Sequence, residues 1–256
     1  APGLTADIVL VKDLEQFQVE KVFKSGKLVA QSGEYLAAVE RKSISSVSGS
    51  FHVKDFGPHR LKMQLNSDQV TVIDLIPGGV VTARGQAKVK LDSERDFLYD
   101  PDQDIVKMAV IERHHGTGNV GLGLLRGYGI KRGAVALSIA HDSHNIIAVG
   151  ISNQEIACAV EALIAQRGGV VLVKDGKILE QMPLPVAGIM SDQSGEWVDE
   201  MLTKLQAAAF DELGVSREVE PLMTLCFMAL PVIPEVKLTD MGLFDVTQFQ
   251  FIPVAK

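Results

Sequence analysis

The chain is poor in cysteine, with two residues, Cys158 and Cys226, among 256. Cys158 lies in a helical pattern and Cys226 in the apolar run LMTLCFMAL, so we expect both to be buried free thiols. The sequence also lacks a signal-peptide pattern and any apolar run approaching the roughly 20 residues that span a bilayer. These absences favour a reducing cytoplasm and no membrane partner.

Positive charge is scarce as well. The sequence has 25 Lys and Arg against 32 Asp and Glu, a formal net charge of −7. A protein that binds the nucleic-acid backbone needs a basic face, so we expect no nucleic-acid partner. The length allows one large domain or two smaller ones with a sizeable core, and the 46% hydrophobic content is typical of a globular chain.

Several catalytic signatures are absent or incomplete. There is no G-x-S-x-G nucleophile elbow and no C-x-x-C pair. The acidic run at 100–104 starts like an EF-hand loop, but Ile105 and Ile111 stand where that loop needs Gly and Glu. The motif GTGNVG at 116–121 fits a dinucleotide fingerprint, yet a nucleotide-binding oxidoreductase would require a helix directly after Gly121. Three further glycines follow, which favours a loop whose glycines allow close backbone approach.

Hydrophobic patterning predicts a mixture of strands and helices. Strands are expected at 7–12, 70–76, 79–91, 104–111, 134–140 and 146–150, with hairpins turning at Ser25-Gly26 and Asp175-Gly176. Helices are expected at 152–169, opened by Ser152 and Glu155 at capping-box spacing, and at 195–213. This mixture predicts an α/β or α+β fold. The Ser-rich stretch 41–50 predicts a boundary that divides the chain into residues 1–48 and 49–256.

Two of the apolar runs are followed directly by polar and titratable side chains. Glu112, Arg113, His114 and His115 follow the run 105–111, and the stretch HDSHN at 141–145 follows the run 134–140. Ligands of α/β sheets bind outside the carboxyl ends of strands. The two ends therefore predict one candidate site.

Strand geometry would limit the roles of these residues. If HDSHN continued its strand, His141 and His144 would face opposite sides and could not share a metal unless the chain turned between them. Asp142 would lie on one face with His144, and Glu112 with His114; a carboxylate beside an imidazole suits acid–base chemistry. The alternative is a buried polar network that pins the two segments together.

Three segments together resemble a known family. ADIVLVKDLEQFQVEKVFKSGKLVA, VIERHHGTGNVGLGLLRGYGIKRGAVALSIAHDSHNIIAVG and GGVVLVKDGKILEQMPLPVAGIMSD resemble, in order, the C-terminal half of bacterial and archaeal adenine deaminases of the amidohydrolase superfamily. The resemblance implies hydrolytic deamination of adenine to hypoxanthine and ammonia, a reaction of purine salvage. It also implies manganese or iron ions, held in a (β/α)₈ barrel.

That barrel opens with an H-x-H pair, which none of the six histidines forms. The resemblance therefore implies that the barrel precedes Ala1 and holds the metal, and that this chain alone does not deaminate adenine. Residues 1–48 would be strands of the small β-sandwich that flanks amidohydrolase barrels. Residues 49–256 would be the mixed α/β C-terminal domain of the family.

The resemblance, joined to the two polar strand ends, assigns roles without any metal ligand in this chain. The expected catalytic residues are Asp142, His144 and Glu112, and the expected substrate-binding residues are Ser143, Asn145, His114 and Asn119. The expected partners are adenine, the barrel portion and further copies in a homo-oligomer. The alternative from another class is a non-catalytic binding or assembly module, in which HDSHN is a polar latch.

Overall fold

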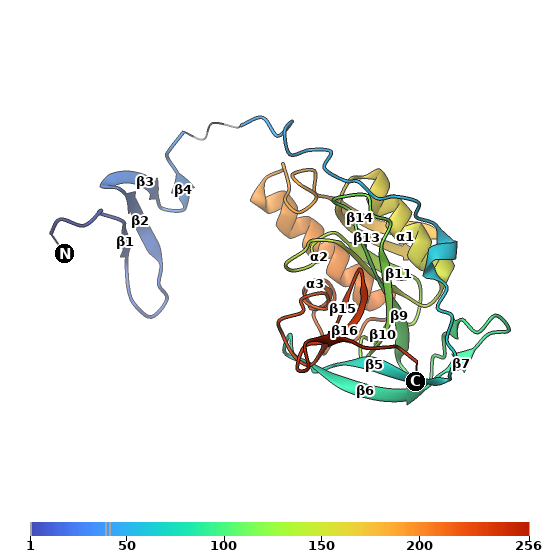
Figure 1. The fold of residues 1–256 in the computed structure, drawn as a ribbon. Coiled ribbons are helices and arrows are strands. Elements are labelled where there is room, and N and C mark those ends of the chain that lie inside the picture. The colour runs from blue at the N-terminus through green and yellow to red at the C-terminus, as the bar shows by residue number, and fades with distance from the viewer. Residues whose placement is uncertain (1, 39, 41, 256) are drawn as a thin grey trace. The chain divides into compact units, whose positions relative to one another are not determined.

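A computed structural model describes residues 2–38, 40 and 42–255 of the chain (Figure 1). Ala1, before which the barrel is expected, and Arg41, the first residue of the expected boundary, lie outside the described residues. The chain divides into two units, residues 1–43 and 44–256, and the division falls inside the Ser-rich stretch.

The first unit is a four-stranded antiparallel sheet. Its strands follow chain order: β1 (Ile8–Val11), β2 (Val19–Lys24), β3 (Lys27–Gln31) and β4 (Glu34–Tyr35). Ser25 and Gly26 take positive φ angles of 50° and 75° and form the predicted turn between β2 and β3. Successive apolar residues on β1 face both sides of the sheet, yet all three from Ile8 to Leu10 are at least 45% exposed. Within the described part of this unit, nothing covers either face of β1.

An eight-stranded sheet organises the second unit. Its order is β14-β13-β11-β12-β9-β10-β5-β6, and every neighbouring pair is antiparallel except β10 and β5. The strands are β5 (Gln69–Leu75), β6 (Thr82–Lys88), β9 (Ile105–Ile111), β10 (Val120–Arg126), β11 (Ala134–Leu137), β12 (Ile146–Gly150), β13 (Gly169–Lys174) and β14 (Lys177–Pro183). The predicted mixed α/β fold is confirmed. The predicted strand 79–91 is shorter, and 134–140 ends at Leu137.

Strand alternation sends side chains to two helical layers. On β11, Ala134 and Ala136 face α1 (Asn153–Ala165), while Val135 and Leu137 face the side of α2 (Gly195–Asp211) and α3 (Met223–Cys226). The Ser152 hydroxyl caps α1 by accepting the N–H of Glu155, as predicted. The Glu155 carboxylate instead accepts the N–H of Gly176, so the capping box is not closed.

A second group of short elements lies beside the eight-stranded sheet. These are the 3₁₀ helix η1 (Pro58–Leu61) and strands β7 (Lys90–Leu91), β8 (Phe97–Leu98), β15 (Val236–Thr239), β16 (Gly242–Asp245) and β17 (Gln250–Phe251). A Cβ on Gly121 would lie 1.9 Å from the carbonyl oxygen of Thr239, so β15 approaches β10 only because this residue is glycine. The residues after Gly121 form a strand, so the nucleotide-binding oxidoreductase is wrong.

A buried lysine ties this group to the sheet. Lys107 on β9 is 2% exposed, and its Nζ donates to Asp96 Oδ1 at 2.7 Å, to the Leu61 carbonyl at 2.8 Å and to Asn153 Oδ1 at 2.6 Å. Burial lowers the pKa of Lys107, while the Asp96 carboxylate opposes that shift. In the part of the chain that the structure describes, no helix has both the length and the apolar character of a membrane span.

Candidate functional site

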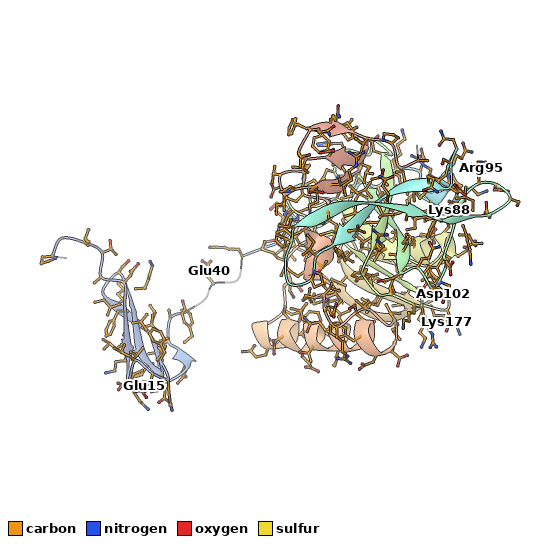
Figure 2. All side chains as sticks on the ribbon, turned by 90° about the horizontal axis from the view of Figure 1, so that it is seen from below. Glu15, Glu40, Lys88, Arg95, Asp102 and Lys177 are labelled. Atoms are coloured by element: carbon orange, nitrogen blue, oxygen red, sulfur yellow. The ribbon has the colours of Figure 1, made fainter. Side chains whose placement is uncertain are left out.

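The sheet topology brings the two polar stretches to one edge. β9 and β11 run in the same direction because each pairs antiparallel with β12, which lies between them. Figure 2 shows Asp102, just before β9, and Lys177, at the start of β14, at one end of the sheet. The stretches that follow Ile111 and Leu137 lie at the opposite end, which we call the polar edge: residues 112–119 and 138–145.

The HDSHN stretch turns instead of continuing β11. Residues 141–143 form a turn between β11 and β12, and the backbone N–H of His144 donates to the carbonyl of Ala140. His144 has a φ of 51°, a left-handed conformation. The rings of His141 and His144 consequently pack edge to face, with centroids 5.4 Å apart. The separation of these two histidines was expected only if the strand continued, and the chain turns between them instead. The placement of Asp142 and His144 on one strand face is wrong for the same reason.

The ERHH segment wraps around its own carboxylate. Glu112 lies in the loop between β9 and β10, is 5% exposed, and accepts the backbone N–H groups of His114, His115 (2.8 Å) and Thr117 (3.0 Å). The Thr117 hydroxyl donates to it as well, at 3.1 Å. Glu112 therefore contacts the backbone of His114 and not its imidazole, contrary to the expected pair of side chains.

These bonds decide the charge of the carboxylate. Burial by itself would raise the pKa of Glu112, but the N–H groups of Thr117, His115 and His114 and the Thr117 hydroxyl together hold the pKa at about 2. Gly116 and Gly118, with φ angles of 62° and 78°, let the loop curl tightly enough to present these donors. The first two glycines of GTGNVG thus shape a loop, as the sequence predicted.

The buried Arg113 side chain joins the two stretches of the polar edge, residues 112–119 and 138–145. It is 1% exposed, its Nε donates to the His144 carbonyl, and one terminal nitrogen donates to the Ala187 carbonyl at 3.1 Å. Its guanidinium lies 4.7 Å from the centre of the Phe51 ring. Burial lowers the pKa of Arg113 to about 10, although the charge of Glu112 opposes this. Sequence reasoning gave Arg113 no role, and the only available signal was its place inside a polar run directly after a buried strand.

A second bond links the loops at the surface. The Nε2 of His114 donates to the Ser143 carbonyl at 2.7 Å. Asp142 and Ser143 are exposed at the tip of the turn. The structure does not bring Asn119 to this tip, because its side-chain amide donates to Asp240 at 3.0 Å.

Unpartnered polar atoms gather at the polar edge. Among the described residues, five buried side-chain polar atoms have no hydrogen-bond partner, and three of them are Arg113 Nη1, His144 Nδ1 and Asn145 Oδ1. Burial lowers the pKa of His144, as do the nearby His141, Arg113 and His114. Buried polar groups are normally paired, so these three mark a place where a ligand or a further segment would complete the bonding.

The donor side chains decide whether this chain could hold a metal. Within residues 2–38, 40 and 42–255, no three or more His, Cys, Asp and Glu side chains converge as a metal site. The adjacent His141 and His144 have no third ligand of these types among the described residues. The residues present do not fit a catalytic metal.

Comparison with known proteins identifies relatives of the whole chain. The model of the adenine deaminase C-terminal domain matches residues 79–250. An "Adenine deaminase 2" of Desulfotalea psychrophila is 58% identical over 98% of this chain, and an "Adenine deaminase" of Ligilactobacillus salivarius is 47% identical over the same share. An "Adenine deaminase 2" of Carboxydothermus hydrogenoformans is 44% identical over 100% of it. The chain spans 44% of the length of each of these relatives.

Proposed function

We propose that this chain is one portion of a longer deaminase, because it belongs to the adenine deaminase family and carries the C-terminal domain of that family. The reaction would be the hydrolytic deamination of adenine to hypoxanthine and ammonia, in purine salvage. The relatives that share up to 58% identity with this chain are more than twice its length, which supports this reading.

The observation that carries the proposal is the group of unpartnered atoms at the polar edge. Arg113 Nη1 is a donor, Asn145 Oδ1 an acceptor, and His144 Nδ1 either, according to its tautomer. A purine presents donors and acceptors on its edges, and amide side chains read such edges by paired hydrogen bonds. We therefore propose that the polar edge faces the mouth of the active site.

Within this proposal the side chains take distinct roles. Asp142 and His144 exchange protons with the substrate, and the lowered pKa of His144 keeps its ring neutral and able to accept a proton near pH 7. Ser143, Asn145 and His114 contact adenine. Glu112 acts as a positioning residue, because four hydrogen bonds and a pKa of about 2 suit it to holding the loop and not to proton exchange.

The family resemblance implies manganese or iron, and a bound metal would supply an activated water. Because the described donor groups do not fit a metal, we propose that its ligands belong to a barrel portion outside this chain. The exposed apolar faces of β1 support the proposal that residues 1–48 complete a β-sandwich with that portion. The cytoplasmic location, supported by two free cysteines, and the homo-oligomer belong to the same proposal.

The direct test is adenine turnover with added manganese or iron, followed by the loss of adenine absorbance. This chain alone should be inactive, whereas a fusion to the N-terminal portion of the Desulfotalea psychrophila relative should be active. In the fusion, His144→Ala should lower kcat/KM by about a hundredfold, and His115→Ala, on an exposed imidazole of the same edge, should stay within about twofold. Turnover by the isolated chain would show that the catalytic metal site lies within it.

The second candidate is an assembly module, in which the polar edge is only a latch. The bonds from Arg113 to His144 and from His114 to Ser143 favour it, because they join the two loops without a ligand. A latch predicts that His114→Ala, which removes the imidazole that donates to the Ser143 carbonyl, lowers the stability of the fusion enzyme and leaves kcat/KM unchanged. The kinetic and unfolding measurements on one variant therefore separate the two functions.

A further inference from the structure

The apolar stripe of α2 lies in two different environments. In the C-terminal half of the helix, Leu205 and Ala209 are fully buried in the core. In the N-terminal half, Val198 and Leu202 are only partly buried and line a pocket of about 690 Å³. Packed interiors leave few voids larger than a water molecule, and this volume is typical of small-molecule sites. The first turns of α2 therefore border a space that the described chain leaves open, while Trp197 and Leu202 on the same turns pack against the core.

The floor and the far wall of this pocket are preformed. Leu137 on β11, Val170 on β13 and Met182 on β14 form the floor, and each is at most 2% exposed. Leu222 and Cys226, each 6% exposed, form a wall at α3. An apolar molecule would bury its surface here without rearranging the core.

Polar groups on the pocket wall select the charge of the occupant. The partly exposed Glu220 carboxylate accepts the Gln206 amide on α2 at 2.9 Å and the backbone N–H of Met223. Among the described residues that line the pocket, none is Lys or Arg, so the carboxylate has no basic counterpart there apart from His141. An anionic group would be repelled by this carboxylate, whereas a neutral or cationic donor would gain a hydrogen bond.

The pocket is also long. It extends along α2 from Gly195 to Gln206, a distance of roughly 16 Å at the helical rise per residue. Met190 and Met223 lie on its walls, and methionine side chains adapt to irregular apolar shapes.

We propose that this pocket binds an elongated apolar small molecule that carries an uncharged or cationic hydrogen-bond donor, such as an arylamine. The site goes beyond the proposed deaminase function and does not depend on it. It shares one residue with the polar edge, His141, whose backbone N–H donates to the Cys226 carbonyl at 2.8 Å.

Two fluorescent probes test the proposal on the full chain. N-phenyl-1-naphthylamine is neutral and has one N–H donor, and 8-anilinonaphthalene-1-sulfonate is the same framework with an added sulfonate. The neutral probe should bind saturably at one site per chain, and the sulfonate should bind at least about tenfold more weakly. Glu220→Gln should reduce the difference in affinity between the neutral probe and the sulfonate. Equal affinity for the two probes, or no saturable binding of the neutral probe, would overturn the proposal.

Variants locate the binding. Leu202→Trp fills the pocket and should weaken the neutral probe by more than about tenfold, whereas Thr203→Trp, on the exposed side of the same helix turn, should leave it unchanged. Met190→Trp provides a second filling variant at a side chain that is 55% exposed, so its folding does not depend on core repacking. Equal weakening by Thr203→Trp would contradict the assignment. Probe binding that appears only on dilution, as the chain dissociates from a second copy, would also refute it.

Discussion

The loop around Glu112 makes a quantitative prediction about stability. The carboxylate has a pKa of about 2 in the folded chain, against an ordinary value of 4.5. A pKa shift of this size corresponds to about 3 kcal/mol of stabilisation when the group is ionised. Because Glu112 is 5% exposed, solvent screening does not greatly reduce this figure.

The sign of the pH dependence follows from the direction of the shift. The folded pKa lies below the unfolded value, so the stabilisation is complete above about pH 4.5 and is lost as the pH falls toward about 2. Glu112→Gln places an amide N–H₂ against backbone N–H donors and removes the charge. We expect it to lower the free energy of unfolding by about 2–3 kcal/mol at pH 7, and the difference from the unaltered chain should shrink in acid.

Urea unfolding is the appropriate assay, followed by the fluorescence of Trp197, the single tryptophan, which lies on α2 in the second unit. Glu161→Gln is the matched control, since it makes the same change at an exposed position of α1. If Glu112→Gln stayed within about 0.5 kcal/mol of the control at pH 7, the carboxylate would not hold this loop. A difference that persisted unchanged at low pH would also count against the reasoning.

Three further outcomes can be measured in the same way. Lys107→Met leaves the buried Asp96 carboxylate without its cation and should cost about 3–5 kcal/mol in urea unfolding; a loss under about 1 kcal/mol would show that the pair is not buried. Gly121→Ala drives a Cβ onto the Thr239 carbonyl and should cost about 2–3 kcal/mol, measured as a lowered Tm. NMR titration of His144 should give a pKa below 6.5, so its contribution to stability is present above that pH and falls as the pH drops toward the folded pKa; a raised pKa would contradict its burial.

Local patterns predicted much of the fold because they record local constraints. The near-continuous apolar runs at 105–111 and 146–150 indicate strands buried on both faces, and the structure has strands there. Ser152 caps α1 through a bond within one helical turn. Strand β10 was missed because its glycines lower strand and helix propensity alike, and only contact with β15 explains them.

The candidate site, too, could be predicted from the sequence only in part. The sequence alone places polar side chains directly after two buried runs, and it resembles one family along nearly its whole length. That resemblance needs only residue identities in order, so it was confirmed without coordinates.

Tertiary structure decided what those residues touch. The turn at 141–143 brings His141 against His144, because antiparallel pairing of β11 with β12 requires the chain to reverse there. It also decided that Glu112 is enclosed by N–H groups, that Arg113 is buried, and that half of α2 borders an open pocket. Each of these depends on the distance between segments far apart in the chain, which hydrophobic periodicity does not encode.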